Sequence, residues 1–247
     1  MKIVHWFEGD LFFPQISGGS THVESLIRGM PSYEHEVLVD NKLKSKRIID
    51  FSSNAKIIRF PSKIFLPNFF GKTKIPLLSV LRFVNEYHCF KSKLRHVLKL
   101  DFDILHFHGV VPYNFSRLNK LFGEKFYQNI LNLSKIPGKK VLTLHNCYPD
   151  HGNFPKDKLL IDVFNHYIET FENIISVDYH IHDYCKKYCS GINLDKKLAY
   201  IPNSVDTDLF NYKPHFQTSK LRIGFTGRLS KTTDFKMIND LINSIPE

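Results

Sequence analysis

Two short apolar runs in this 247-residue chain end in histidine, DILHFH at 103–108 and KVLTLH at 140–145. A third short apolar run, KIVHWF, stands at 2–7. Runs this short and apolar are typical of strands buried on both faces, as in a parallel sheet. Open α/β sheets bind ligands at the carboxyl ends of their strands, so His108 and His145 are candidates for a binding site.

Helical patterns alternate with these runs and with further predicted strands. The strands are expected at 35–39, 56–60, 173–177, 197–201 and 221–226, and the helices at 23–30, 77–100, 157–172 and 234–245. This order of elements predicts an α/β fold. The basic run from Lys42 to Arg47 falls between two predicted strands, and we expect it to be a solvated loop.

The charge balance limits the classes of partner. Lys and Arg outnumber Asp and Glu by 34 to 24, a formal charge of +10, which favours phosphorylated ligands or an anionic membrane surface. No zinc-finger, helix-turn-helix or RNA-recognition pattern accompanies this charge, so nucleic acid is not expected as a partner. Aromatic residues beside lysines at 63–74 suit a membrane interface, although a helix packed on a sheet is the preferred interpretation of 77–100.

Two further observations bear on where the protein works. No apolar run reaches the length of about 18 residues that a membrane-spanning helix needs, and MKIVHWFEGD does not read as a signal peptide. The four cysteines, Cys89, Cys147, Cys185 and Cys189, show no framework spacing. We therefore expect a reduced, cytoplasmic protein, with contact to the inner face of the membrane as an open alternative.

Gly18 and Gly19 stand between the first predicted strand and the first predicted helix. A strand, a glycine-rich turn and a helix gather backbone N–H groups and the positive end of the helix dipole at one point, where an anion can bind. The same glycines could simply permit a tight turn. The local pattern favours neither interpretation over the other.

Two segments near the carboxyl end carry the most specific pattern. The first, KLAYIPNSVDTDLF at 197–210, is a strand that should stop at Pro202-Asn203. The second, LRIGFTGRLS at 221–230, is a strand that closes on Gly227-Arg228. Glycine and then a cation ahead of a helix commonly present backbone N–H groups and positive charge to a phosphate.

Together the two segments resemble family 4 glycosyltransferases with the GT-B fold. IPNSVDTDLF resembles their IPNGVDTxxF signature, and IGFTGRLS resembles the strand that opens their nucleotide-sugar-binding domain. Gly18-Gly19, DILHFHG and VLTLHN extend the resemblance over nearly the whole chain. It implies an acceptor-side domain at 1–205, with a Rossmann-like parallel sheet and helices on both faces. It also implies a hinge and the first βα unit of a second Rossmann-like domain at 206–247.

The resemblance implies roles for particular residues. His108 would face the donor sugar as the catalytic residue. The donor- or substrate-binding residues would be Gly18, Gly19, His145, Asn203, Arg228 and Lys231. Arg228 matches an arginine that stabilises the departing diphosphate together with a lysine and helix N-termini. Because the family does this without a metal, we expect neither a metal nor a cofactor, with the nucleotide sugar as substrate.

The chain departs from the family pattern in its last third. Thr233-Asp234 stand where a Lys-Gly pair is usual, and an aspartate near a diphosphate is unfavourable; Lys231 or Lys236 could replace the missing lysine. Ser204 takes the place of the usual glycine in the PNGVD turn. The family's acidic E-x7-E element is absent, and about 27 residues cannot close a core of their own. We therefore expect the sequence to stop within its second domain.

Three functions remain open. The preferred one is a hexosyltransferase-type glycosyltransferase that moves a sugar from a nucleotide sugar to a glycan or lipid-linked acceptor, with retention, in cell-surface polysaccharide or glycolipid synthesis. The second is a non-catalytic module that binds a glycan or a partner. The third is a metal hydrolase, whose ligands would be His106, His108, His145 and His151. A rival metal pair, His180 and His182, is weaker because a helix would put the two on different faces.

Overall fold

The computed structural model describes residues 1–7, 18–41, 47–61, 76–109, 121–145, 158–189 and 193–203, together with Asp240 and Asn243. Contacts divide the chain into two compact units, Met1–Ser204 and Val205–Glu247. Every strand and helix named below belongs to the first unit. The βα unit predicted at 221–245 lies almost wholly outside the described residues. The assignment of 1–205 and 206–247 to an acceptor-side and a donor-side domain stays a prediction.

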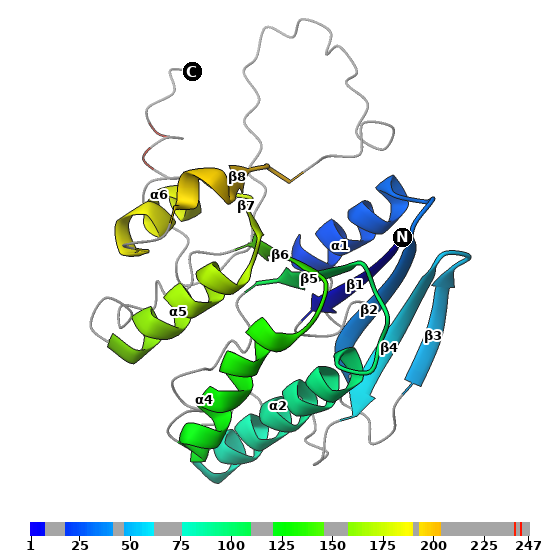
Figure 1. The fold of residues 1–247 in the computed structure, drawn as a ribbon, viewed down its shortest axis with the longest axis horizontal. Helices are drawn as coiled ribbons and strands as arrows, with labels where there is room; N and C mark the ends of the chain where they lie inside the picture. Colours follow the sequence, from blue (N-terminus) through cyan, green and yellow to red (C-terminus); the bar gives the residue numbers. More distant parts are fainter. Residues whose placement is uncertain are drawn as a thin grey trace, which may run out of the picture. The chain divides into compact units, whose positions relative to one another are not determined.

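The first unit is built on an eight-stranded sheet with the order β3-β4-β2-β1-β5-β6-β7-β8 (Figure 1). The strands are β1 (Lys2–Phe7), β2 (Glu34–Asn41), β3 (Arg47–Ser52), β4 (Ala55–Pro61), β5 (Ile104–His108), β6 (Lys139–Leu144), β7 (Asn173–Ser176) and β8 (Leu198–Tyr200). Neighbouring strands are parallel except for β3, which pairs with β4 in the antiparallel direction. The chain starts at the centre of the sheet and builds outward to both sides, as a doubly wound sheet does. The predicted α/β fold with a parallel sheet is confirmed.

Helices cover both faces of this sheet, as predicted. They are α1 (Gly18–Gly29), α2 (Pro76–Val97), α4 (Glu124–Leu131), α5 (Lys158–Thr170) and α6 (Tyr179–Tyr188), with short 3-10 turns η2 (Asn132–Lys135) and η4 (Leu194–Lys196). Helix α1 packs on one side of β1, and α2, α4 and α5 lie on the opposite side (Figure 1). The larger core is on the side of α2, α4 and α5.

Alternation along the central strands separates apolar from polar side chains. In β1, Val4 and Trp6 enter the larger core, so His5 between them faces the side of α1. In β5, Leu105 and Phe107 likewise enter the larger core. The two histidines of β5 therefore share the α1 face with His5.

The parallel register then brings these histidines together. His5 lies opposite His106, and Phe7 lies opposite His108 on the neighbouring strand. On the other side of β5, His108 lies opposite Thr143 of β6. Polar side chains thus collect on one face of β1, β5 and β6, although each strand reads as apolar in the sequence.

A buried lysine holds the carboxyl end of β1. Lys93 of α2 is 1% exposed, and its Nζ donates a hydrogen bond of 2.8 Å to the carbonyl oxygen of Phe7. The same nitrogen lies 2.6 Å from Oδ1 of Asp40 in β2. A buried ammonium group requires such partners, so Lys93 ties α2 to the ends of two central strands.

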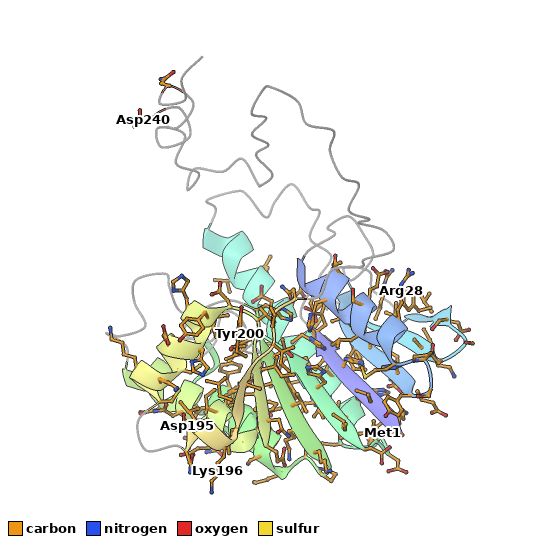
Figure 2. The ribbon with its side chains drawn as sticks, turned by 90° about the horizontal axis from the view of Figure 1, so that it is seen from above. Met1, Arg28, Asp195, Lys196, Tyr200 and Asp240 are labelled. Carbon is orange, nitrogen blue, oxygen red and sulfur yellow. The ribbon has the colours of Figure 1, made fainter. Side chains whose placement is uncertain are left out.

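Figure 2 labels residues that mark the two edges of the sheet. β1 begins just after Met1, and β8 ends at Tyr200. Met1 therefore marks the side of the sheet where the parallel strands begin, and Tyr200 the side where they end. Among the helices that the structure describes, none is long and apolar enough to cross a membrane.

Two elements differ from the sequence-based expectation. Arg47, expected in a solvated loop, begins strand β3, while 42–46 lie outside the described residues. Strand β3 pairs with β4 at the sheet edge, and its Ile48 is 62% exposed. The sequence of β3 therefore lacks the apolar pattern that a buried strand would show. Helix α4 was also missed, because Phe126 and Ile130 are the only fully buried residues among those of the helix whose side chains the structure describes.

The turn before β6 gives a test of the backbone. Gly138 has φ of +87°, and a Cβ there would lie 2.9 Å from Cε2 of Phe102. We expect Gly138→Ala to lower the free energy of unfolding by about 1–2 kcal/mol, because an L-residue is strained in the left-handed region. Urea denaturation measures this. The control is Gly29→Ala, where an added Cβ meets no atom within 4 Å. Equal stability of the two variants would contradict the prediction.

Candidate functional site

Six histidines gather on the face of the sheet that α1 covers, and we call them the histidine cluster: His5, His22, His35, His106, His108 and His145. They come from β1, α1, β2, β5 and the end of β6. Ring centroids of neighbouring members lie 4.1 to 5.9 Å apart, from the close His106–His108 pair to His22–His108. The cluster therefore runs across four strands without interruption.

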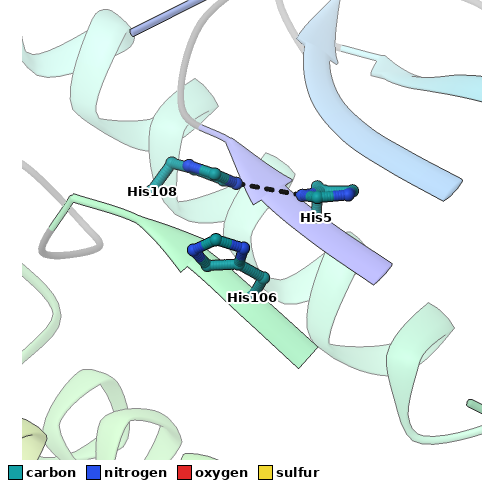
Figure 3. A group of neighbouring side chains, drawn as sticks. All are labelled: His5, His106 and His108. Carbon is teal, nitrogen blue, oxygen red and sulfur yellow. Dashed lines mark hydrogen bonds between the residues drawn. The ribbon is translucent and has the colours of Figure 1, made fainter. Parts of the chain in front are cut away.

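Three of these rings form a chain of hydrogen bonds. Nδ1 of His5 lies 3.0 Å from Nε2 of His108, a contact drawn as the dashed line in Figure 3. Nε2 of His5 lies 3.0 Å from Nδ1 of His35. Nε2 of His35 lies 3.0 Å from the carbonyl oxygen of Met30. All three rings are buried, with at most 5% of each exposed.

The last bond of the chain sets the direction of the others. A carbonyl oxygen only accepts, so His35 must donate from Nε2 to Met30. When the three rings are neutral, each has one N–H, and Nδ1 of His35 accepts from His5. By the same step Nδ1 of His5 accepts from Nε2–H of His108. This chain of hydrogen bonds thus leaves Nδ1 of His108 without a hydrogen, and that nitrogen carries a lone pair.

Burial favours the neutral form of His5, His106, His108 and His145. It lowers the pKa of His5 and His108 well below the ordinary imidazole value, and neighbouring histidines lower it further. Burial, with a smaller contribution from His22, lowers the pKa of His106 to about 3 and that of His145 to about 4. A charged ring here would lose its hydration and be repelled by the others, which explains both effects.

His106 has a separate anchor. Its Nε2 lies 2.7 Å from Oγ1 of Thr143, a residue of β6 that is fully buried. Figure 3 shows the His106 ring next to those of His5 and His108 over strands β1 and β5. The hydroxyl therefore occupies a ring nitrogen of His106 and fixes how that ring lies against His108.

His22 joins the start of α1 to the ends of two strands. It stands in the second turn of the helix that begins at Gly18, and it is half-buried. Its ring centroid lies 4.8 Å from that of His145 and 5.9 Å from that of His108. Burial lowers the pKa of His22, and a hydrogen bond with the side chain of Asn203 partly offsets this effect.

Two ring nitrogens in this region have no hydrogen-bond partner among the described residues. They are Nδ1 of His108 and Nε2 of His145, and both atoms are buried. An unpaired buried polar atom costs about 1–3 kcal/mol, so native structures rarely keep one without a reason such as a bound ion, water or ligand. These nitrogens mark the place where the cluster can receive a ligand.

The structure brings together most of the residues that the sequence singled out. Gly18 and Gly19 begin α1, four and three residues before His22, and His108, His145 and Asn203 all contact His22. Arg228 and Lys231 lie outside the described residues, as does His151. The roles of all these residues stay predictions.

The other predicted pairs lie elsewhere. His180 and His182 both belong to α6, and His180 is exposed while His182 is partly buried. Cys185 and Cys189 are buried free thiols, and hydrogen bonding to Cys185 lowers the pKa of Cys189. Both belong to the larger core. Cys147 lies outside the described residues.

Sequence analysis missed His5, His22 and His35. A signal for His5 was present, because Ile3-Val4-His5-Trp6 and Ile104-Leu105-His106-Phe107 repeat one pattern. Two parallel neighbours with that pattern place their histidines side by side, as the register of β1 and β5 shows. His22 and His35 carry no comparable signal, since their contacts depend on how α1 and β2 pack.

The direction of the hydrogen-bond chain can be measured. We expect His5, His35 and His108 to be Nε2–H tautomers above neutral pH, because the carbonyl of Met30 forces that order. Long-range ¹⁵N–¹H spectra of labelled protein distinguish the two imidazole nitrogens. His5→Phe serves as the reference, since it removes the central link and frees His108 to change tautomer. An Nδ1–H signal for His108 in the unaltered protein would contradict the assignment.

No protein-family model matches the sequence, and no curated protein matches it either. Solved structures do match. One, described as "Trehalose-6-phosphate from E. coli bound with UDP-2-fluoro glucose", has a TM-score of 0.51 at 8% identity, over 85% of this chain and 50% of that chain. Another, an alpha,alpha-trehalose 6-phosphate synthase from Burkholderia multivorans, has a TM-score of 0.46 at 13% identity, over 84% and 50%.

The chain thus spans about half the length of the solved structures it matches. Only the first similarity exceeds a TM-score of 0.5, and at 8% identity it supports the fold and not the activity. The first unit has the Rossmann-like architecture of the GT-B glycosyltransferases.

Proposed function

We propose that this chain belongs to a glycosyltransferase that moves a sugar from a nucleotide-sugar donor to an acceptor hydroxyl. One observation carries the proposal. The side chain of His22, near the start of α1, is in contact with His108, His145 and Asn203. These three residues come from distant parts of the sequence. The family resemblance had selected the same three residues, together with Gly18 and Gly19 at the start of that helix.

The amino end of α1 would bind the donor diphosphate. The helix begins with two glycines, has no acidic side chain in its first turn and is 12 residues long. The backbone N–H groups of its first turn point toward this end, and together with the helix dipole they favour an anion there. In this proposal Arg228 and Lys231 have the roles that the family resemblance implies and add positive charge at the diphosphate, so that transfer proceeds without a metal ion.

His108 would orient the donor sugar. Its Nδ1 carries a lone pair, while Nε2 donates to His5, so the ring can accept a hydrogen bond from a sugar hydroxyl. In the reaction the bond from the anomeric carbon to the diphosphate breaks and a bond to the acceptor oxygen forms. The acceptor's proton passes to the departing diphosphate. His108 then acts by fixing the position of the anomeric carbon.

The finer assignments come from the resemblance. We propose a hexose donor, transfer with retention, and a glycan or lipid-linked acceptor in the synthesis of a cell-surface polysaccharide or glycolipid. The reaction would take place in the cytoplasm. One of the matched structures is described with UDP-2-fluoro glucose, which makes UDP-sugars the first donors to test.

Thermal-shift and transfer assays with UDP-, GDP- and ADP-sugars test this function. We expect one donor class to stabilise the protein, and His108→Ala and Arg228→Ala to lower kcat/KM about 100-fold or more. His180→Ala, at an exposed position of α6, is the matched control and should behave like the unaltered protein. Undiminished transfer in both site variants would reject the assigned roles. If the protein binds a glycan but transfers no sugar from any of these donors, a non-catalytic module is favoured instead.

We also infer a contact with the inner face of the membrane on the side of α2. A hollow of about 240 Å³ lies there, and its lining contains three basic residues and no acidic one: Lys91, Leu94, Arg95, Leu98, Asn129, Asn132 and Lys135. Leu98 at its rim is 52% exposed. Basic side chains around an exposed apolar one suit an anionic lipid headgroup.

Flotation with lipid vesicles tests the membrane contact. We expect the protein to float at low salt with vesicles that contain phosphatidylglycerol and to stay behind with phosphatidylcholine alone. Replacing Lys91 and Arg95 by Glu should abolish flotation, because repulsion then replaces attraction. The control replaces Lys186 and Lys187 of α6 in the same way. Equal flotation of both double variants would rule out the surface of α2.

A further inference from the structure

Three histidines of the cluster converge near the amino end of α1: His22, His108 and His145. Each offers one ring nitrogen, and these three nitrogens lie within 4.8 Å of one another. Around zinc, with Zn–N bonds of about 2.0–2.1 Å, ligand nitrogens are about 3.3–3.6 Å apart. An inward movement of about 1 Å would therefore be enough to reach a coordinating geometry.

A second trio of the cluster, His5, His106 and His108, satisfies the same distance criterion. It is the poorer candidate because most of its ring nitrogens already have hydrogen-bond partners. Both nitrogens of His5 take part in the hydrogen-bond chain, and Nε2 of His106 pairs with Thr143. A metal ion between these rings would have to break hydrogen bonds that now satisfy buried ring nitrogens, and that loss would cost free energy.

Two ring nitrogens of the trio His22, His108 and His145 have no hydrogen-bond partner among the described residues. Nδ1 of His108 is buried, carries a lone pair and has no partner in the described part of the chain. Nε2 of His145 is buried and unpaired in the same way. These two orphaned atoms are an observation independent of the distances among the rings.

The surroundings of the trio have the form of an outer coordination shell. A metal-binding histidine usually gives its second nitrogen to a hydrogen-bond partner, which fixes the tautomer and the ring orientation. His108 has such a partner in His5, His5 is held by His35, and His35 is held by the carbonyl of Met30. His22 has one in the side chain of Asn203. The rings of His108 and His22 are thus aligned before any ion arrives.

We propose that His22, His108 and His145 bind a divalent transition-metal ion with imidazole preference, Zn²⁺ being the test case. Three histidines leave a fourth position open for water or for an oxygen of a substrate. The inference goes beyond the proposed function, and metal content can be measured without any transfer assay. The expectation of a metal-free site, which rests on the family resemblance, is the opposite outcome of the same experiment.

The experiment is equilibrium dialysis of the whole chain against Zn²⁺, with the bound metal measured by mass spectrometry. We expect one tightly bound ion per chain. Co²⁺ in its place should give the visible absorption of a four-coordinate nitrogen site. His22→Ala and His145→Ala, both at partly buried positions, should each lower the affinity about 100-fold or more. Asn203→Ala should lower it about 10-fold by releasing His22.

Two controls make the result specific. His180→Ala tests for adventitious binding at an exposed histidine and should keep the full complement of metal. His106→Asn keeps a polar partner for Thr143 and should also keep the metal, because His106 belongs only to the other trio. Circular dichroism and urea unfolding confirm that every variant is folded.

Three results would overturn the inference. The first is no stoichiometric metal in the unaltered protein. The second is metal retained at full affinity in both His22→Ala and His145→Ala. The third is metal lost in His106→Asn and retained in His22→Ala, which would assign the ion to the other trio.

Discussion

The carbonyl oxygen of Met30 accepts hydrogen bonds and cannot donate them, and the arrangement of the buried histidines depends on that restriction. It fixes the ring of His35, then that of His5, and finally that of His108. Each bond satisfies a polar atom whose burial unpaired would cost about 1–3 kcal/mol. The chain ends at one lone pair on Nδ1 of His108, so a backbone group at the end of α1 determines the chemistry available at the end of β5.

The two proposals concern that same lone pair. A sugar hydroxyl can donate to it, and a divalent ion can bind it, but not at the same time. Zn²⁺ would then inhibit the proposed transfer by occupying His108. The fold allows either use, since Rossmann-like sheets serve many chemistries at the carboxyl ends of their strands.

The sequence predicted much of the fold because its central strands are apolar and short. The runs at 2–7 and 103–108 could be recognised without any tertiary information, and so could the helix that follows Gly18. Strand β3 could not, since Ile48 is exposed and the strand exists through pairing with β4. An edge strand such as β3 forms because the neighbouring strand supplies its hydrogen-bond partners.

The candidate site was predictable in part for the same reason. His108 and His145 stand at the carboxyl ends of strands, where open α/β sheets bind their ligands. His22 and His35 were not predictable, because their roles arise from contacts between elements far apart in the sequence. The hydrogen-bond direction needs three such contacts at once, and no local pattern encodes it.

The alternation in β1 and β5 has a consequence for how these strands tolerate change. His5 stands beside Trp6 and His106 beside Phe107, so each strand sends imidazole to one face and a large aromatic ring to the other. Deleting one residue within either strand would turn every later side chain over. The aromatic rings would then meet the polar histidines, and imidazoles would enter the apolar core. Point substitutions can therefore change what this face binds, whereas a shift of a single residue would abolish both the binding face and the core.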